Sequence, residues 1–159
     1  MKRTLSRAGL LAAALALILA LGACGNNSAQ QPVYTLDDAQ TLLDSGAFDP
    51  SMAQVPSDLV AGLYGLDAGS LQECVCYMAT NTSVSADELT ILILSDESAA
   101  QAAAEACQAR VENQIAVCES YAPAAVPRLE DAVIRQAGNT VLLAVGDPAA
   151  LPDAVDALD

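Results

Sequence analysis

Residues Leu89–Leu94 read LTILIL, a short run rich in Ile and Leu with polar residues on both sides. Such a run predicts a buried β-strand. The preceding run, Leu71–Thr80, predicts a second strand, and Asn81–Ser85 supplies a polar turn between the two. We therefore expect the two strands to pair as an antiparallel hairpin.

A long helix is predicted directly after this hairpin, from Asp96 and Glu97 to about Ser120. Good helix formers, chiefly Ala, Gln, Glu and Arg, dominate the segment. Pro123 disfavours helical backbone at the residue before it and so ends the helix. Apolar residues recur at spacings of three and four and form one stripe for packing: Ala100, Ala104, Cys107, Val111, Ile115 and Cys118.

Two further apolar runs, Ala132–Gln136 and Thr140–Val145, predict a second hairpin with Ala137–Asn139 as its tight loop. Short helices are expected on both sides of the hairpins, over 35–45, 57–64 and 149–158. This order predicts one α+β domain over residues 35–159. Its four-stranded, largely antiparallel sheet has the order ββαββ, with the long helix packed across one face and short flanking helices.

The N-terminal segment resembles the signal of bacterial lipoproteins. Lys2, Arg3 and Arg7 precede the 13 apolar residues Gly9–Leu21, which are too few to span a bilayer, and Gly-Ala then leads to Cys24. In such signals the chain is cut before the Cys, whose thiol carries a diacylglyceryl group. We expect residues 1–23 to be a signal peptide and Cys24 to be the lipid attachment site. An ordinary secretory signal with an incidental Cys is the alternative.

Residues 24–34 are mostly polar and predict a flexible tether between the lipid and the domain. The protein is therefore expected to be exported and held at the cell membrane through Cys24. After residue 23 the chain has three arginines against 20 acidic residues, a net charge of −17, with no Lys and no His. Nucleic-acid binding needs basic residues to neutralise phosphates, so we expect no nucleic-acid partner.

Four cysteines remain after Cys24: Cys74, Cys76, Cys107 and Cys118. In an exported protein they could form disulfides. The two strand cysteines lie ~6.6 Å apart along a strand, and the two helix cysteines lie ~16.5 Å apart along a helix axis. These unequal spans allow at most one disulfide without distortion. The alternative to a disulfide is that these cysteines are buried thiols without a partner.

The sequence contains no recognisable catalytic constellation. The absence of His excludes Ser-His and Cys-His nucleophiles and His-ligated metals. Neither a G-x-S-x-G elbow, nor a P-loop, nor a dinucleotide-binding glycine fingerprint is present. We therefore predict no catalytic residue, no cofactor and no metal site.

Four segments together resemble a known family. They are LYGLD at Leu63–Asp67, SADELTILIL at Ser85–Leu94, SYAP at Ser120–Pro123, and LEDAVIRQAGNTVLLAVGD at Leu129–Asp147. In this order they resemble a family of bacterial lipoproteins known as domain of unknown function 4358. The resemblance implies an envelope location and an α+β fold, and it brings no catalytic residues with it.

Two functions are compatible with these observations. The first is a non-enzymatic, lipid-anchored module that binds or scaffolds an envelope protein or ligand. The alternative is a thiol-based redox or metal-handling lipoprotein that uses Cys74, Cys76, Cys107 and Cys118. Replacement of these four residues would leave partner binding intact in the first case and abolish activity in the second.

Overall fold

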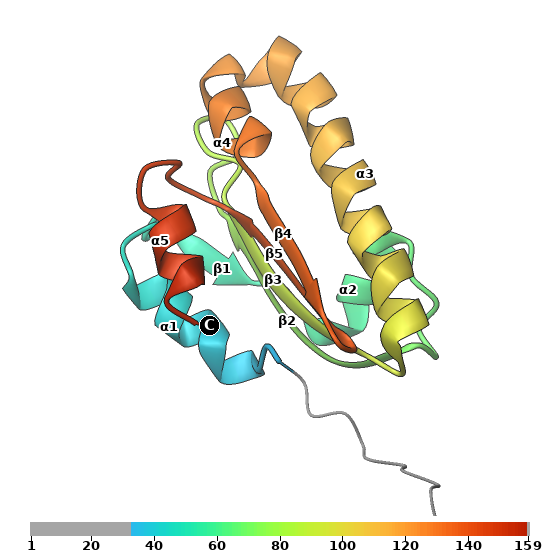
Figure 1. Cartoon of the computed structure of the whole chain (residues 1–159). Coiled ribbons are helices and arrows are strands. Elements are labelled where there is room, and N and C mark those ends of the chain that lie inside the picture. Colours follow the sequence, from blue (N-terminus) through green and yellow to red (C-terminus); the bar gives the residue numbers. More distant parts are fainter. Residues whose placement is uncertain (1–32, 159) are drawn as a thin grey trace, which may run out of the picture.

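The computed structural model describes residues 33–158 (Figure 1). The expected signal peptide, Cys24 and most of the expected tether lie outside these residues. In chain order the elements are α1 (Leu36–Asp44), β1 (Met52–Gln54), α2 (Ser57–Tyr64), β2 (Leu71–Ala79), β3 (Glu88–Leu94), α3 (Glu97–Tyr121), the 3₁₀ helix η1 (Pro123–Ala125), α4 (Val126–Glu130), β4 (Val133–Ala137), β5 (Thr140–Val145) and α5 (Leu151–Asp156).

The strands form one antiparallel sheet in the order β1-β2-β3-β5-β4. β3, which contains the LTILIL run, pairs with β2 on one side and with β5 on the other. Every residue of β3 and β5 is buried, which explains why these strands read as nearly continuous apolar runs. In the β4–β5 turn Gly138 adopts a φ of 55°, as its place in a tight hairpin loop predicts.

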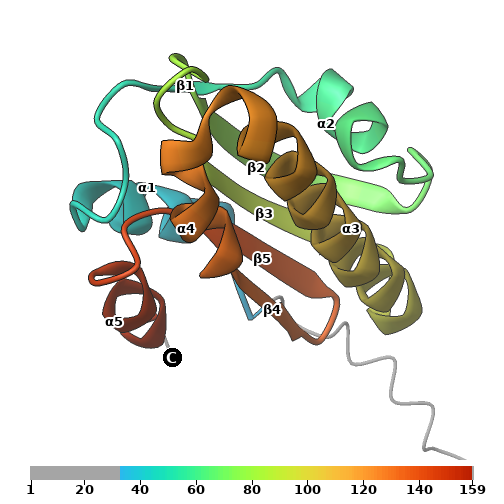
Figure 2. The same cartoon turned by 90° about the horizontal axis from the view of Figure 1, so that it is seen from above.

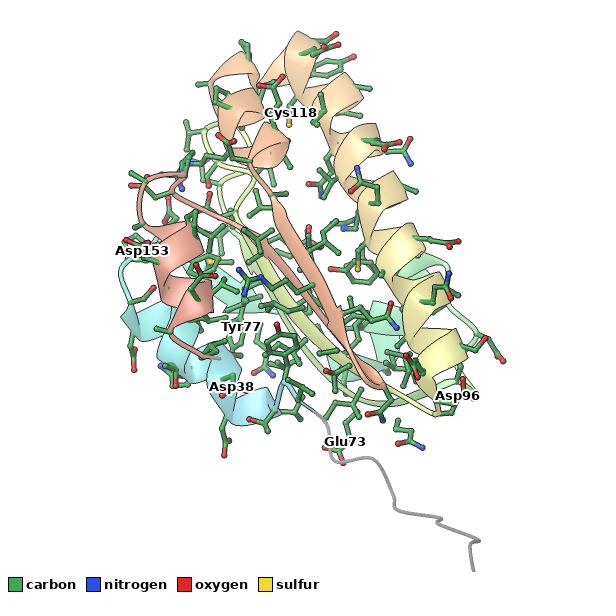
Figure 3. All side chains as sticks on the ribbon, in the orientation of Figure 1. Asp38, Glu73, Tyr77, Asp96, Cys118 and Asp153 are labelled. Carbon is green, nitrogen blue, oxygen red and sulfur yellow. The ribbon has the colours of Figure 1, made fainter. Side chains whose placement is uncertain are left out.

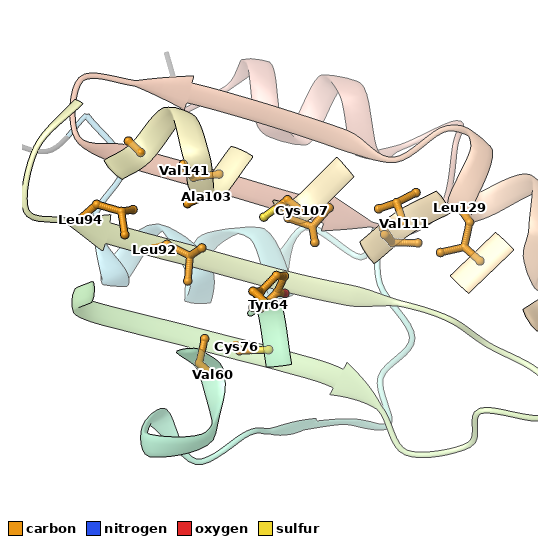
Figure 4. Packing of buried hydrophobic residues seen from close by; sticks show 13 residues of the cluster. Val60, Tyr64, Cys76, Leu92, Leu94, Ala103, Cys107, Val111, Leu129 and Val141 are labelled. Carbon is orange, nitrogen blue, oxygen red and sulfur yellow. The ribbon is translucent and has the colours of Figure 1, made fainter. Parts of the chain in front are cut away.

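Helices cover both faces of the sheet (Figures 1 and 2). α2, α3 and α4 pack on one face, and α1 and α5 pack on the other. Because side chains alternate along a strand, Leu92 and Leu94 of β3 face α3, whereas Leu89 and Ile91 face α1 and α5. Figure 4 shows the cluster on the α3 side, where Leu92 and Leu94 lie beside residues from α2 and α3.

The two halves of α3 have different surroundings. The helix begins after Asp96, whose Oδ1 accepts a 2.9 Å hydrogen bond from the backbone N–H of Ala99. This bond is the main cause that lowers the pKa of Asp96. The buried residues of the helix all lie between positions 100 and 111: Ala100, Ala103, Cys107 and Val111. Ile115 and Cys118 are only half-buried, since the second half extends beyond the packed core towards α4 (Figure 1).

The α+β class, the antiparallel sheet and the long helix are confirmed. The prediction of four strands in ββαββ order is wrong, because β1 adds a fifth strand that pairs Met52–Gln54 with Tyr77–Ala79 at the edge of the sheet. Three residues are too few to show an alternating pattern, so this strand depends on pairing with β2. The short helices η1 and α4 were also not predicted, because each is too short to show a helical pattern.

Candidate ligand-binding groove

A groove of about 780 Å³ lies between the second half of α3, the β2–β3 hairpin and the end of α2. Its volume is within the range of small-molecule sites, about 300–1,000 Å³. Most of its lining is apolar, with small side chains prominent: Leu63, Gly65, Met78, Ala79, Ala86, Ala106, Ala109, Val117, Cys118 and Ala122.

The groove exists because small residues stand where α3 faces the hairpin. Ala106 and Ala109 lie on the helix, and Ala79 and Ala86 lie on the opposite wall. The C-terminal end of α3 lines the groove and also packs against η1 and α4, where Leu129 is fully buried. Figure 3 shows Cys118 in this region, close to α4 and far from Asp96 at the other end of the helix.

A buried ion pair between α3 and β3 borders the groove. Arg110 Nε lies 2.7 Å from Glu88 Oε1, and Arg110 Nη2 lies 2.8 Å from Glu88 Oε2. The side chain of Glu88 is 1% exposed and that of Arg110 is 15% exposed. Because two parallel N–H···O bonds are charge-assisted and fix the planes of both groups, this pair holds α3 at a defined distance from the sheet.

Three further side chains complete the network around Glu88. The Tyr64 hydroxyl donates to Glu88 Oε1 and lies 2.7 Å from Thr90 Oγ1. Gln114 Nε2 donates to Glu88 Oε2 at 3.1 Å. The Arg110 guanidinium also lies over the Tyr64 ring, 5.3 Å from its centroid, in a cation–π contact. The network therefore joins α2, β3 and α3 through one carboxylate.

The pKa shifts in this network favour the charged arginine and the neutral tyrosine. Burial alone would lower the pKa of Arg110, but the hydrogen bonds and charge of Glu88 outweigh burial and raise it. Burial, followed by the negative charge of Glu88, raises the pKa of Tyr64 well above its ordinary value. Tyr64 therefore acts as a hydrogen-bond donor, and neither group is prepared for proton transfer at neutral pH.

A second ion pair, in which the acid alone is buried, lies next to the first. Asp87 is 1% exposed, and its two carboxylate oxygens accept from Arg128 Nη1 of α4 at 2.8 and 2.7 Å. The Ser85 hydroxyl and the backbone N–H of Asp49 also donate to Asp87. This pair anchors α4 to the start of β3 and thereby fixes the wall opposite the C-terminal end of α3.

Large apolar side chains are exposed at the rim of the groove. Tyr121 is 83% exposed and Val117 is 58% exposed, and both line the groove. Val84, 61% exposed, lies in the adjacent hairpin turn between Thr82 and Ser85, which are themselves lining residues. An exposed apolar patch beside a concavity is a common mark of a binding site.

The four cysteines all belong to the α3 side of the sheet. Cys76 and Cys107 are buried in that cluster (Figure 4), and Cys74 and Cys118 lie half-buried at its margin. None of these four thiols is joined to another in the structure. Because α3 is unbroken from Glu97 to Tyr121, Cys107 and Cys118 are separated by ~16.5 Å along its axis.

Burial disfavours the thiolate form of three of these residues. It raises the pKa of Cys76 to about 11 and that of Cys107 to about 12, and it also raises the pKa of Cys74. Nucleophilic and metal-binding thiols need the opposite shift. Within residues 33–158 no three Cys, Asp, Glu or His side chains are close enough to hold a metal ion. No helix in this part of the chain is long and apolar enough to cross a membrane.

The residues of the Glu88 network were not predicted from the sequence. The central strand was expected to begin at Leu89, and neither Glu88 nor Thr90 was expected in a site. A signal was present, since Glu88 and Thr90 are two polar residues at alternate positions in an otherwise apolar strand and must therefore share a face. The contributions of Tyr64 and Arg110 come from α2 and α3, and only the tertiary structure brings them together.

The raised thiol pKa values predict a loss of stability at alkaline pH. Unfolded thiols ionise near 9.0, whereas folded Cys76 and Cys107 keep their protons until pH about 11 and 12. The contribution of the two protonated thiols to the free energy of unfolding is therefore fully present below pH ~8.5. It decreases as pH rises above this value, by up to about 1.4 kcal/mol per pH unit for each thiol. Urea unfolding of the reduced protein at stepped pH values measures this slope.

The control is a variant with Cys76→Ala and Cys107→Ala. It is expected to be less stable at every pH, because two buried side chains lose volume, but its stability should fall less steeply between pH 8 and 10. An unchanged slope in this variant would show that these thiols are not the groups responsible.

Comparison with protein families matches residues 44–146 to the domain of unknown function DUF4358. The match starts at the last residue of α1 and includes every strand of the sheet, so it begins earlier than the motifs that suggested the family. Cys24 lies outside the matched residues. No curated protein and no solved structure matches the chain. Because the match covers more than half of the chain, the protein belongs to the DUF4358 family.

Proposed function

We propose that this protein is a lipid-anchored, non-catalytic binding module of the cell envelope, and that the groove beside α3 is its ligand site. The observation that carries the proposal is the groove itself, an open concavity bordered by a rigid network of buried polar groups. Arg110 and Tyr64 have pKa shifts that suit holding a shape rather than moving protons. The raised pKa values of Cys74, Cys76 and Cys107 weigh against the thiol-based alternative.

The groove lies at the end of the sheet that is remote from the tether. The backbone N–H of Tyr34, near the start of the described chain, donates to Thr140 Oγ1 at the beginning of β5. The groove lies at the other end, where Glu88 pairs with Val145. Five residues of extended strand separate the two ends by ~17 Å. The groove therefore lies at the opposite end of the sheet from the point where the tether would join the domain.

The proposed anchor predicts a change of location in one variant. Cys24→Ala removes the thiol that would carry the lipid, so the protein is expected to move from the membrane fraction to the soluble exported fraction. Fractionation followed by immunoblotting measures this shift, and Cys118→Ala provides a matched Cys-to-Ala control that should remain membrane-bound. Retention of the Cys24→Ala variant in the membrane fraction would contradict the lipid anchor.

The proposed groove site predicts that bound ligands protect Cys118 from alkylation. Cys118 lines the groove, whereas Cys74 is also half-buried but lies outside it, near Ser57. A fragment library of mixed charge is added to the full chain, and the rate at which iodoacetamide modifies each Cys is followed by mass spectrometry. Fragments that bind in the groove should lower the rate of Cys118 alkylation several-fold and leave the rate of Cys74 alkylation unchanged.

Two variants locate the effect on α3. Ala109→Trp fills the groove and is expected to remove protection, whereas Ala102→Trp places the same ring on an exposed position of the same helix outside the groove. Protection should persist in the Ala102→Trp variant. If no fragment of any charge protects Cys118, the groove is not a binding site and the proposed function is wrong.

A further inference from the structure

We infer that the ligand of the groove is an uncharged, largely apolar small molecule that carries a neutral hydrogen-bonding group such as an amide. This inference rests on the proposed function and adds the chemical class of the ligand. It comes from the contrast between the groove and the rest of the protein. The chain has a net charge of −14, yet the groove presents no unpaired charge.

The charged residues of the groove cancel one another. Only Arg110 and Asp87 among the lining residues carry a charge. Arg110 pairs with Glu88 and Asp87 pairs with Arg128, so the four groups sum to zero. A charged ligand that entered the groove would lose part of its hydration without gaining an unpaired counter-ion, which is unfavourable.

Glu88 already compensates the charge of Arg110, which weakens its attraction for an anionic ligand. Arg110 Nε contacts both oxygens of Glu88, at 2.7 and 3.1 Å, and its Nη2 contacts Oε2 at 2.8 Å. The cation–π contact with Tyr64 holds the guanidinium plane in the same place. Nη1 is the guanidinium nitrogen outside these hydrogen bonds. An anion that approached Nη1 would share the guanidinium with Glu88 and would be repelled by the negative charge of that carboxylate.

A cationic ligand would also find no unpaired counter-ion in the groove. Asp87 lines the groove and Glu88 pairs with the lining residue Arg110, and the side chains of both acids are only 0–1% exposed. The exposed carboxylates of α3, at Glu105, Glu112 and Glu119, do not line the groove. A cation would therefore be attracted to other surfaces of this acidic domain more strongly than to the groove.

The remaining lining suits a neutral ligand. Alkyl groups of residues such as Leu63, Met78 and Val117 supply apolar contact. Thr82, Asn113 and Gln114 add hydroxyl and amide groups, which donate and accept hydrogen bonds without charge. A site of this composition and volume is typical of those that bury apolar ligands and orient them through a few polar contacts.

The test uses three probes that share one ring system and differ in charge: 2-naphthamide (neutral), 2-naphthoate (anionic) and 2-naphthylmethylammonium (cationic). Each is titrated against the purified full chain, and the concentration that halves the rate of Cys118 alkylation is determined. We expect 2-naphthamide to act at a concentration about tenfold or more below that of either ion, equivalent to about 1.4 kcal/mol. Its effect should not change between low and high salt.

Three results would overturn the inference while leaving the proposed function intact. They are equal or stronger protection by the anion, equal or stronger protection by the cation, and no protection by any of the three probes when other fragments do protect. The effect of 2-naphthamide must also disappear in Ala109→Trp and persist in Ala102→Trp. Protection that survives in Ala109→Trp would place the probe elsewhere and would equally overturn the inference.

Discussion

The architecture on the α3 side of the sheet depends on the buried ion pair between Glu88 and Arg110. A carboxylate that is 1% exposed is tolerable only when its charge is compensated and its oxygens are hydrogen-bonded. Arg110, Tyr64 and Gln114 supply those partners from α2 and α3. Removal of one partner of a buried pair costs about 3–5 kcal/mol, because the other charge is left uncompensated. Glu88 and its partners therefore fix where α2 and α3 lie over the sheet. The same contacts position two walls of the groove.

The distribution of charge follows from the same constraint. All three arginines of the described chain are in ion pairs, and Arg110 and Arg128 pair with two adjacent buried acids, Glu88 and Asp87. The other carboxylates lie mainly on the outer surface, where water solvates them and mutual repulsion opposes aggregation. The two charged residues that line the groove, Arg110 and Asp87, are both paired, which is consistent with the uncharged ligand proposed for it. Stability and the proposed selectivity thus have one physical origin.

Much of the fold could be predicted because its main elements have strong local signals. The LTILIL run, the long Ala-rich helix and the Gly138 turn each follow from composition and spacing. β1 and α4 are too short for such signals and depend on tertiary contacts. The groove was not predictable, because it results from small residues on α3 facing small residues on the hairpin. The Glu88–Arg110 pair joins residues 22 positions apart in sequence, and no local pattern reports such a contact.

A double-mutant cycle on this pair tests the account most directly. The free energy of unfolding is measured for Glu88→Gln, Arg110→Met and the double variant, with Arg135→Met and Asp156→Asn as a control cycle on a more exposed pair. We predict that each single change at the buried pair costs about 3–5 kcal/mol and that the double variant recovers at least about 2 kcal/mol of their sum. The control coupling should be below about 1 kcal/mol. Additive effects at Glu88 and Arg110, with coupling no larger than in the control, would contradict the claim that this pair holds α3 on the sheet.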